Sequence, residues 1–268
     1  MPGTARVGNY SLECALPARR HELAFRAAHV LLPRLVRLVI LHPTHGTRDA
    51  VARMLREACL VEKLRHPGIP RLYECGRLST GRPWLAYELV EGPTLAESTT
   101  PRSPIEVLAI LCELAEILAY AHAHGVVHGA VRPASIVRGA EQLYLCDWSH
   151  SQLVEQDPQA DIYALGVLAV DLLQHAGPYD VKSLVDRMLA PDPADRPTAA
   201  EVVAEASRSR EALEAIELAL DGQTDPAIED VVLVDIAEPG STAVRWTPPL
   251  GTHPPDTIPI QNEPSRRR

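Results

Sequence analysis

The chain has 268 residues, of which 46% are apolar and 23% are charged, so it is long enough to form one domain with a sizeable core. The net charge is −9, and the acidic excess lies between residues 211 and 238, a stretch with no Lys or Arg. The rest of the chain is neutral overall, which argues against nucleic acid as the main partner because phosphate binding needs a basic excess on one face.

Cysteine usage and hydropathy indicate the cellular compartment. No two cysteines form a CxxC pair, so we interpret all five as buried thiols in a reducing compartment (Cys14, Cys59, Cys75, Cys112 and Cys146). The apolar run at residues 28–41 is interrupted by Arg34 and Arg37, so it is too short and too charged to span a membrane. We also expect no signal peptide, and therefore a cytoplasmic protein.

The first third of the chain is predicted to be a sheet with one helix. Residues 10–25 and 34–43 have the pattern of short strands, and the second is apolar enough either to be covered on both faces or to lie at a sheet edge. Thr47 is placed to cap a helix that ends near residues 66–68, where Pro and Gly follow. Two further strands are predicted around residues 71–74 and 84–90.

Helices dominate the prediction from residue 103 onwards. Ser103 and Glu106 form a capping box, and the helix behind them has one apolar stripe and ends at Gly125. His122 and His124 lie two positions apart and point to different sides, so we interpret them as surface or helix-end residues rather than metal ligands.

The final segments are acidic and then rich in proline. An acidic helix is predicted to continue from residue 207 through Leu220. Residues 231–236 and 242–246 form either a hairpin or a linear motif that adds a strand to a partner. Residues 248–268 are predicted to be disordered.

Four motifs indicate a family. The sequences HGAVRPASIV at residues 128–137, LCDWS at 145–149, DIYALG at 161–166 and DPADRP at 192–197 resemble motifs of bacterial-type serine/threonine protein kinases. In that family the first two read HRDLKPENIL and DFG. The resemblance implies an α+β, two-lobed fold with a small β-rich N-lobe and a shortened helical C-lobe.

The resemblance also implies domain boundaries. The N-lobe and hinge correspond to residues 1–95 and the C-lobe to 96–207. Residues 208–247 then hold the acidic helix and the possible hairpin or linear motif, and 248–268 the tail. Only fourteen positions separate Asp147 from Asp161, so the segment in which kinases bind peptide substrates is short.

By the same resemblance, the residues that carry phosphotransfer are replaced. The strand lysine falls at Val39, and the catalytic base falls at Ala130, which has no lone pair to offer. Arg132 stands for the lysine that meets the transferred phosphate, and Ser135 for the metal-binding asparagine. The phosphate loop at residues 16–25 contains no glycine.

Three arginines of the first 40 residues are not expected to bind phosphate. Arg37, on the same face of its strand as Val39, would obstruct an adenine base. Arg19 and Arg20 are adjacent, and we interpret them as a solvated turn rather than a phosphate site.

Several positions of the family pattern are retained. Glu57 corresponds to the helix glutamate that pairs with the strand lysine, Tyr87 to the gatekeeper, and Glu88 and Val90 to the hinge. Asp147 corresponds to the magnesium ligand. Two interpretations of Asp147 stand, residual Mg²⁺ coordination or a strand-end Asp bonded to backbone amides, and we favour the second. His128, Asp161 and Arg196 are expected to be structural, with Glu155 a candidate partner of Arg196.

The sequence therefore predicts a pseudokinase that is not an enzyme and needs no cofactor or metal. It would bind a protein partner, such as an active kinase, as a scaffold or allosteric regulator in signalling. One alternative is a divergent serine/threonine kinase that uses ATP and Mg²⁺ with Asp147 and Arg132. Another is a structural subunit of a larger assembly.

Overall fold

The computed structural model describes residues 5–19, 21–98, 102–153, 157–173 and 181–221. The described residues belong to one compact unit. The predicted hairpin, the Pro-rich tail, Arg20 and Glu155 lie outside the described residues.

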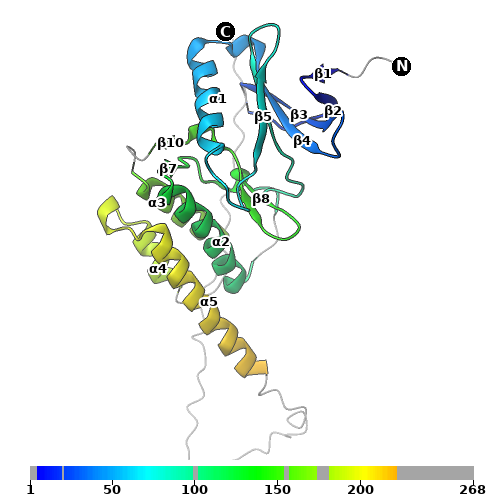
Figure 1. Ribbon diagram of the computed structural model, residues 1–268. Coiled ribbons are helices and arrows are strands. Elements are labelled where there is room, and N and C mark those ends of the chain that lie inside the picture. The colour runs from blue at the N-terminus through cyan, green and yellow to red at the C-terminus, as the bar shows by residue number, and fades with distance from the viewer. Residues whose placement is uncertain (1–4, 20, 99–101, 154–156, 174–180, 222–268) are drawn as a thin grey trace, which may run out of the picture. The chain divides into compact units, whose positions relative to one another are not determined.

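The N-terminal part is a six-stranded antiparallel sheet with the strand order β1-β2-β3-β4-β6-β5 (Figure 1). Its strands are β1 (Arg6–Val7), β2 (Tyr10–Leu16), β3 (Glu22–His29), β4 (Leu35–Leu41), β5 (Leu72–Arg77) and β6 (Pro83–Glu88).

Strand β4 lies inside this sheet, between β3 and β6, so the sheet-edge alternative is wrong. Successive side chains of a strand point to opposite faces. Val36 and Leu38 accordingly pack in one apolar cluster with Trp84, whereas Val39 and Leu41 belong to the main core. The near-continuous apolar sequence reflects burial on both faces.

Helix α1 (Arg48–Val61) packs beside the sheet (Figure 1). The hydroxyl of Thr47 accepts a hydrogen bond from the backbone N–H of Ala50 at 3.2 Å, which satisfies one unpaired amide of the first turn. The helix ends earlier than predicted because the chain turns after Val61 to bury Leu64, which is 1% exposed.

The second part of the compact unit is helical. Its helices are α2 (Pro104–Ala123), α3 (Gln159–Leu173), α4 (Val181–Met188) and α5 (Ala199–Asp221). Short strands β7 (Val126–Val127), β8 (Ile136–Arg138), β9 (Leu143–Leu145) and β10 (Gln152–Leu153) lie between α2 and α3. Four single-turn 3₁₀ helices complete the described elements, namely η1 (Pro43–His45), η2 (Pro133–Ser135), η3 (Trp148–His150) and η4 (Pro193–Asp195).

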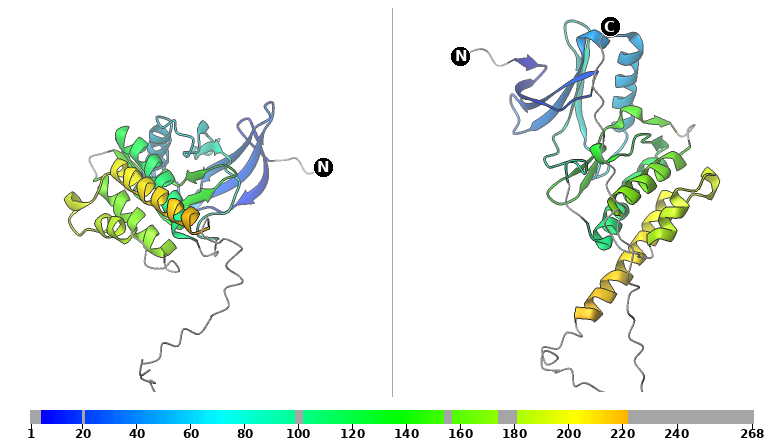
Figure 2. Two further views of the ribbon diagram at one scale, coloured as in Figure 1. Left: turned by 90° about the horizontal axis from the view of Figure 1, so that it is seen from below. Right: turned by 180° about the vertical axis from the view of Figure 1, so that it is seen from behind.

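Helix α2 is the centre of this part. The predicted capping box is confirmed, since Ser103 N donates to Glu106 Oε2 at 2.8 Å and Glu106 N donates to Ser103 Oγ at 3.2 Å. The helix is buried on more sides than the single predicted stripe, because α3 and α5 both pack against it (Figures 1 and 2). A helix that is apolar almost all round is typical of such a position.

Helix α5 is one continuous helix through Asp221, which confirms the helical part of the acidic segment. Its last turns extend past the end of α2 in both figures. Ile216 and Leu218 on these turns are exposed.

Helix α3 exposes an apolar stripe. Tyr163, Val167 and Val170 are each more than 40% exposed and recur at intervals of four and three residues, so they share one side of the helix. The opposite side is buried, so this helix has apolar residues on both sides.

The structure bears on the burial of the cysteines and on the prediction that no segment spans a membrane. The interpretation of all five cysteines as buried is wrong, because Cys14, Cys59 and Cys75 are exposed. Within the described ranges, no helix combines the length and apolar character that crossing a membrane requires.

Candidate functional site

A cleft of about 540 Å³ lies where the sheet and α1 face the helical part. Val39 and Arg37 of β4 lie in its wall, with Glu57 of α1 and Asp147 from the segment after β9. The hinge residues Glu88, Leu89 and Val90 line it as well. The only lysines of the chain, Lys63 and Lys182, are exposed and lie outside this cleft.

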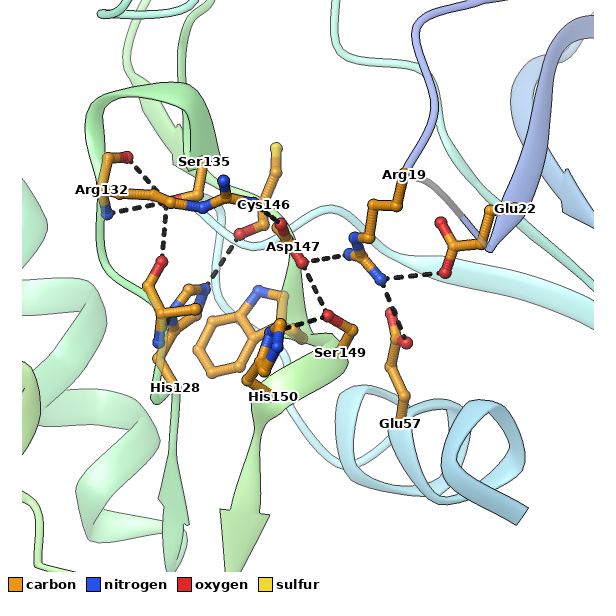
Figure 3. Close-up of polar contacts among 12 residues, drawn as sticks. Arg19, Glu22, Glu57, His128, Arg132, Ser135, Cys146, Asp147, Ser149 and His150 are labelled. Atoms are coloured by element: carbon orange, nitrogen blue, oxygen red, sulfur yellow. Dashed lines mark hydrogen bonds and ion pairs between the residues drawn. The ribbon is translucent and has the colours of Figure 1, made fainter. Parts of the chain in front are cut away.

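Arg19 is the central cation of the cleft (Figure 3). Its guanidinium lies 3.0 Å from Glu22 Oε1 and 3.7 Å from Glu57 Oε2, and it also contacts Asp147 Oδ1. Burial acts to lower the pKa of Arg19, but the carboxylates of Glu22, Glu57 and Asp147 outweigh it, so the net shift is upward. The interpretation of Arg19 as a solvated turn is therefore wrong, since only 29% of its side chain is exposed.

Glu57 is almost fully buried at the cleft end of α1. It accepts a hydrogen bond from the Tyr87 hydroxyl at 3.0 Å. Burial raises the pKa of the Glu57 carboxyl to about 7, although Arg19 acts in the opposite direction. Burial and the neighbouring Glu57 also raise the pKa of Tyr87 well above its ordinary value. Val39, at the expected lysine position, is 6% exposed and offers no charge.

Arg37 lies in the cleft wall, as its place on β4 predicts. Its guanidinium donates to the backbone oxygen of Pro17 at 2.5 Å. Burial lowers the pKa of Arg37. This arginine therefore ties β4 to the turn that carries Arg19.

The loop at residues 128–135 is held by Asp161, which is 1% exposed on α3. The Asp161 carboxylate accepts from the backbone N–H groups of His128 and Gly129, both at 2.8 Å, and it pairs with His122 Nε2 at 2.9 Å. His122 thus lies in the last turn of α2 as expected, but it is a half-buried partner of Asp161 rather than a surface group. Gly129 has φ +74°, and a Cβ there would lie 2.9 Å from the His150 oxygen.

The His128 ring is fully buried and neutral. Its Nδ1 accepts from the Ala130 N–H at 3.2 Å, so the proton lies on Nε2, which donates to the Cys146 oxygen at 2.9 Å. Burial lowers the pKa of His128, in keeping with this assignment. His128 therefore joins the loop to the segment that carries Asp147.

Ser135 has an internal role in the same loop. Its hydroxyl is 2.8 Å from the Arg132 oxygen and accepts from the Arg132 N–H at 3.1 Å. It also lies 3.3 Å from the Ala130 oxygen. Ala130 takes part in these hydrogen bonds through its own backbone N–H and oxygen. Ser135 is 1% exposed.

Asp147 is the only non-glycine residue with a positive φ in the described part of the chain, at φ 66° and ψ 57°. Its Oδ1 contacts Arg19 and accepts from the Ser149 hydroxyl at 2.9 Å, and its Oδ2 accepts from Arg132 at 2.5 Å. The favoured interpretation, a carboxylate bonded to backbone amides, is therefore wrong. The carboxylate instead lies between two guanidinium groups.

The remaining predicted positions are the hinge residues, which line the cleft, and Arg196, which does not. Glu88 accepts from the Arg71 N–H at 3.2 Å, and Val90 lines the cleft. Arg196 donates to the backbone oxygens of Ala190 and Gln159, at 2.8 and 3.0 Å. The Arg196 contacts stabilise the fold away from the cleft.

Comparison with known proteins identifies the relatives of this chain. No protein-family model matches it. It is 33% identical over 147 residues to the serine/threonine-protein kinase pkn2 of Myxococcus xanthus, which covers 52% of this chain and 18% of that protein. It is 27% identical over 226 residues to the serine/threonine-protein kinase PknL of Mycobacterium tuberculosis, which covers 72% of this chain and 56% of that protein. The chain thus spans only part of the length of these relatives.

The solved kinase domain of M. tuberculosis PknI has the same fold. It superimposes with a TM-score of 0.65 at 24% identity, covering 78% of this chain and 98% of that domain. The predicted two-lobed α+β fold is therefore confirmed, as is the resemblance to bacterial serine/threonine kinases.

The relatives also correct one prediction. The residues Val39 and Ala130 and the missing glycines predict that the chain is not an enzyme. The relatives named above are serine/threonine protein kinases, which are enzymes, and this finding contradicts that conclusion.

Proposed function

We propose that this chain, a relative of bacterial serine/threonine kinases with their fold, is a cytoplasmic signalling domain that works by binding a protein partner. It acts as a scaffold or as an allosteric regulator of that partner. The observation that carries this proposal is the exposed apolar stripe of α3, formed by Tyr163, Val167 and Val170. Exposed apolar side chains that share one side of a helix are a feature of protein-interaction sites, although the Tyr163 ring also contacts the Arg196 guanidinium, 4.8 Å from its centroid.

Helix α3 carries apolar residues on its exposed side as well as on its buried side. A helix that faces water on one side normally carries polar residues there. In α3 the buried side holds Ile162, Leu165 and Leu168, and the exposed side repeats apolar residues at helical spacing. Covering the stripe with a partner would remove its apolar area from water, which is favourable by about 25 cal/mol per Å².

The test is capture of a partner by the full chain and by Val167→Glu/Val170→Glu, with Leu31→Glu/Leu32→Glu as the matched control. Leu31 and Leu32 are 85% and 47% exposed at the turn between β3 and β4, so the two substitutions add the same charge elsewhere. We expect one protein to be enriched by the wild type and the control and lost with the α3 variant. Equal capture by all three proteins contradicts the proposal. Capture by a chain that ends at Asp221 measures what residues 222–268 contribute to partner binding.

ATP-dependent phosphotransfer is a second candidate, supported by the named relatives and by the retention of Asp147 and Arg132 in the cleft. It predicts transfer of radiolabel from the γ-phosphate of ATP to the chain or to a generic substrate. This transfer should be lost in Asp147→Asn and kept in the control Asp186→Asn, whose carboxylate is exposed on α4. Absence of labelling by the wild-type chain removes this candidate and leaves partner binding untouched.

A further inference from the structure

Three carboxylates converge on one point of the cleft. Glu22 at the start of β3, Glu57 on α1 and Asp147 after β9 all contact the guanidinium of Arg19 (Figure 3). Their side chains are only 14%, 8% and 12% exposed. Carboxylates that are close together and shielded from water repel one another and stay ionised only if a cation neutralises them.

Proteins of this fold that transfer phosphate hold a divalent cation at the position of Asp147. Such a cation needs free oxygen ligands in a near-octahedral arrangement. Here Asp147 Oδ1 contacts Arg19 and Ser149, and Oδ2 accepts from Arg132. Glu57 Oε1 accepts a hydrogen bond from the Tyr87 hydroxyl, and the Ser135 hydroxyl is hydrogen-bonded within its own loop.

The donor set therefore does not fit a metal ion. Among the described residues, no group of three or more His, Cys, Asp or Glu side chains is arranged to hold one. The space at the centre of the three carboxylates is filled by the planar guanidinium of Arg19, whose fork of N–H donors suits several carboxylates at once.

We infer that Arg19 is a built-in cation that replaces a divalent metal ion in this cleft. It joins the turn after β2, helix α1 and the Asp147 segment through one guanidinium. In the wild type these carboxylates are not arranged to hold a metal ion. Removing the guanidinium would free three inward-facing carboxylates to close in on a cation, and carboxylate oxygens are the ligands that Mg²⁺ and Mn²⁺ prefer. The inference goes beyond partner binding and does not rest on it.

The test measures the melting temperature of the full chain with MnCl₂ and with EDTA. The wild type should not respond, because Arg19 already occupies the site. Arg19→Ala should melt lower than the wild type in EDTA and gain at least about 3 °C in MnCl₂. The triple variant Arg19→Ala/Glu57→Gln/Asp147→Asn should lose that gain. Arg26→Ala is the matched control, since Arg26 also bridges two carboxylates, Glu13 and Glu91, but on the surface.

Two results would overturn the inference. One is a wild-type chain stabilised by Mn²⁺ in a way that Asp147→Asn abolishes, because the metal would then fit beside Arg19. The other is an Arg19→Ala chain that Mn²⁺ does not stabilise. If Arg19→Ala folds too poorly to melt, its soluble yield on refolding in Mn²⁺ is compared with that in EDTA, and equal yields count against the inference.

Discussion

The guanidinium of Arg19 lies 3.7 Å from the carboxylate of Glu57, although one residue comes from the turn after β2 and the other from α1. By resemblance to kinases, a cation for Glu57 was expected at the strand position of Val39. The cation that the structure places opposite Glu57 comes instead from the turn after β2, and Val39 lines the same cleft.

A lysine at position 39 should compensate in part for the loss of the Arg19 guanidinium. Arg19→Met leaves buried carboxylates without their cation, and we expect it to lower the free energy of unfolding by about 3 kcal/mol. Arg19→Met/Val39→Lys supplies a cation from β4 and should recover more than half of that loss. Arg26→Met, at an exposed ion pair, should leave the denaturation midpoint nearly unchanged. Urea denaturation of the four proteins checks the order, and a double variant less stable than Arg19→Met contradicts it.

The buried Glu57 should make stability fall as pH rises. Its pKa is raised by burial from 4.5 to about 7, so between these values the folded chain keeps a proton that the unfolded chain releases. The wild type should therefore lose up to roughly 3 kcal/mol relative to Glu57→Gln as pH rises from 4.5 to 7, and no more above that.

The control for this pH dependence is Glu97→Gln. The stability of the wild type relative to this variant should rise with pH rather than fall. The backbone N–H of Thr94 lowers the pKa of the exposed Glu97, so its contribution is present above pH 4.5 and is lost as pH falls through its lower pKa in the folded chain. Denaturation by guanidinium chloride at four pH values measures both effects on the free energy of unfolding. A flat difference between the wild type and Glu57→Gln would show that Glu57 titrates normally.

The loop at residues 128–135 should depend on Asp161. Asp161→Asn places an amide N–H₂ opposite groups that donate, so we expect a loss of about 3 kcal/mol. The control Asp186→Asn, which breaks an exposed pair with Lys182, should change stability little. Hydrogen exchange at the His128 amide gives a local readout. Exchange that is unchanged in Asp161→Asn argues against this role.

Gly92 after the hinge should be much less replaceable than Gly81. Both have positive φ, but a Cβ at Gly92 would lie 2.0 Å from the Arg138 backbone oxygen, whereas at Gly81 nothing lies within 4 Å. Gly81→Ala therefore tests backbone strain alone, about 1 kcal/mol, and Gly92→Ala adds a backbone clash, for a total of roughly 3 kcal/mol. Thermal unfolding of the two variants compares them, and equal shifts would remove the clash from the explanation.

The fold could be predicted because its signals are local. The capping box at Ser103 and the apolar sequence of β4 each specify one element, and the helix and strand periods follow from burial. The arrangement of the lobes followed from the resemblance of four motifs to those of bacterial serine/threonine kinases, not from any local signal. The end of α1 was missed because the burial of Leu64 is a tertiary effect that no local pattern records.

The centre of the site could not be predicted in the same way. Arg19 lies in a turn next to another arginine, which by composition indicates solvent exposure. Its contacts with Glu57 and Asp147 span 38 and 128 positions, so they exist only once the sheet, α1 and the loop are assembled. The available signal was the lack of a lysine to pair with Glu57 and Asp147, the two acidic positions that the family resemblance implies for the cleft, which required some other cation.

The lack of a cleft lysine has a practical consequence for surveys of nucleotide-binding proteins. Reagents that acylate an amine beside a bound adenosine need a lysine within reach, and Lys63 and Lys182 both lie outside the cleft. Such reagents would find no lysine to acylate in the cleft, whatever the cleft binds. Dicarbonyl reagents, which condense with guanidinium groups, would instead report on Arg132, whose side chain is 52% exposed at the cleft.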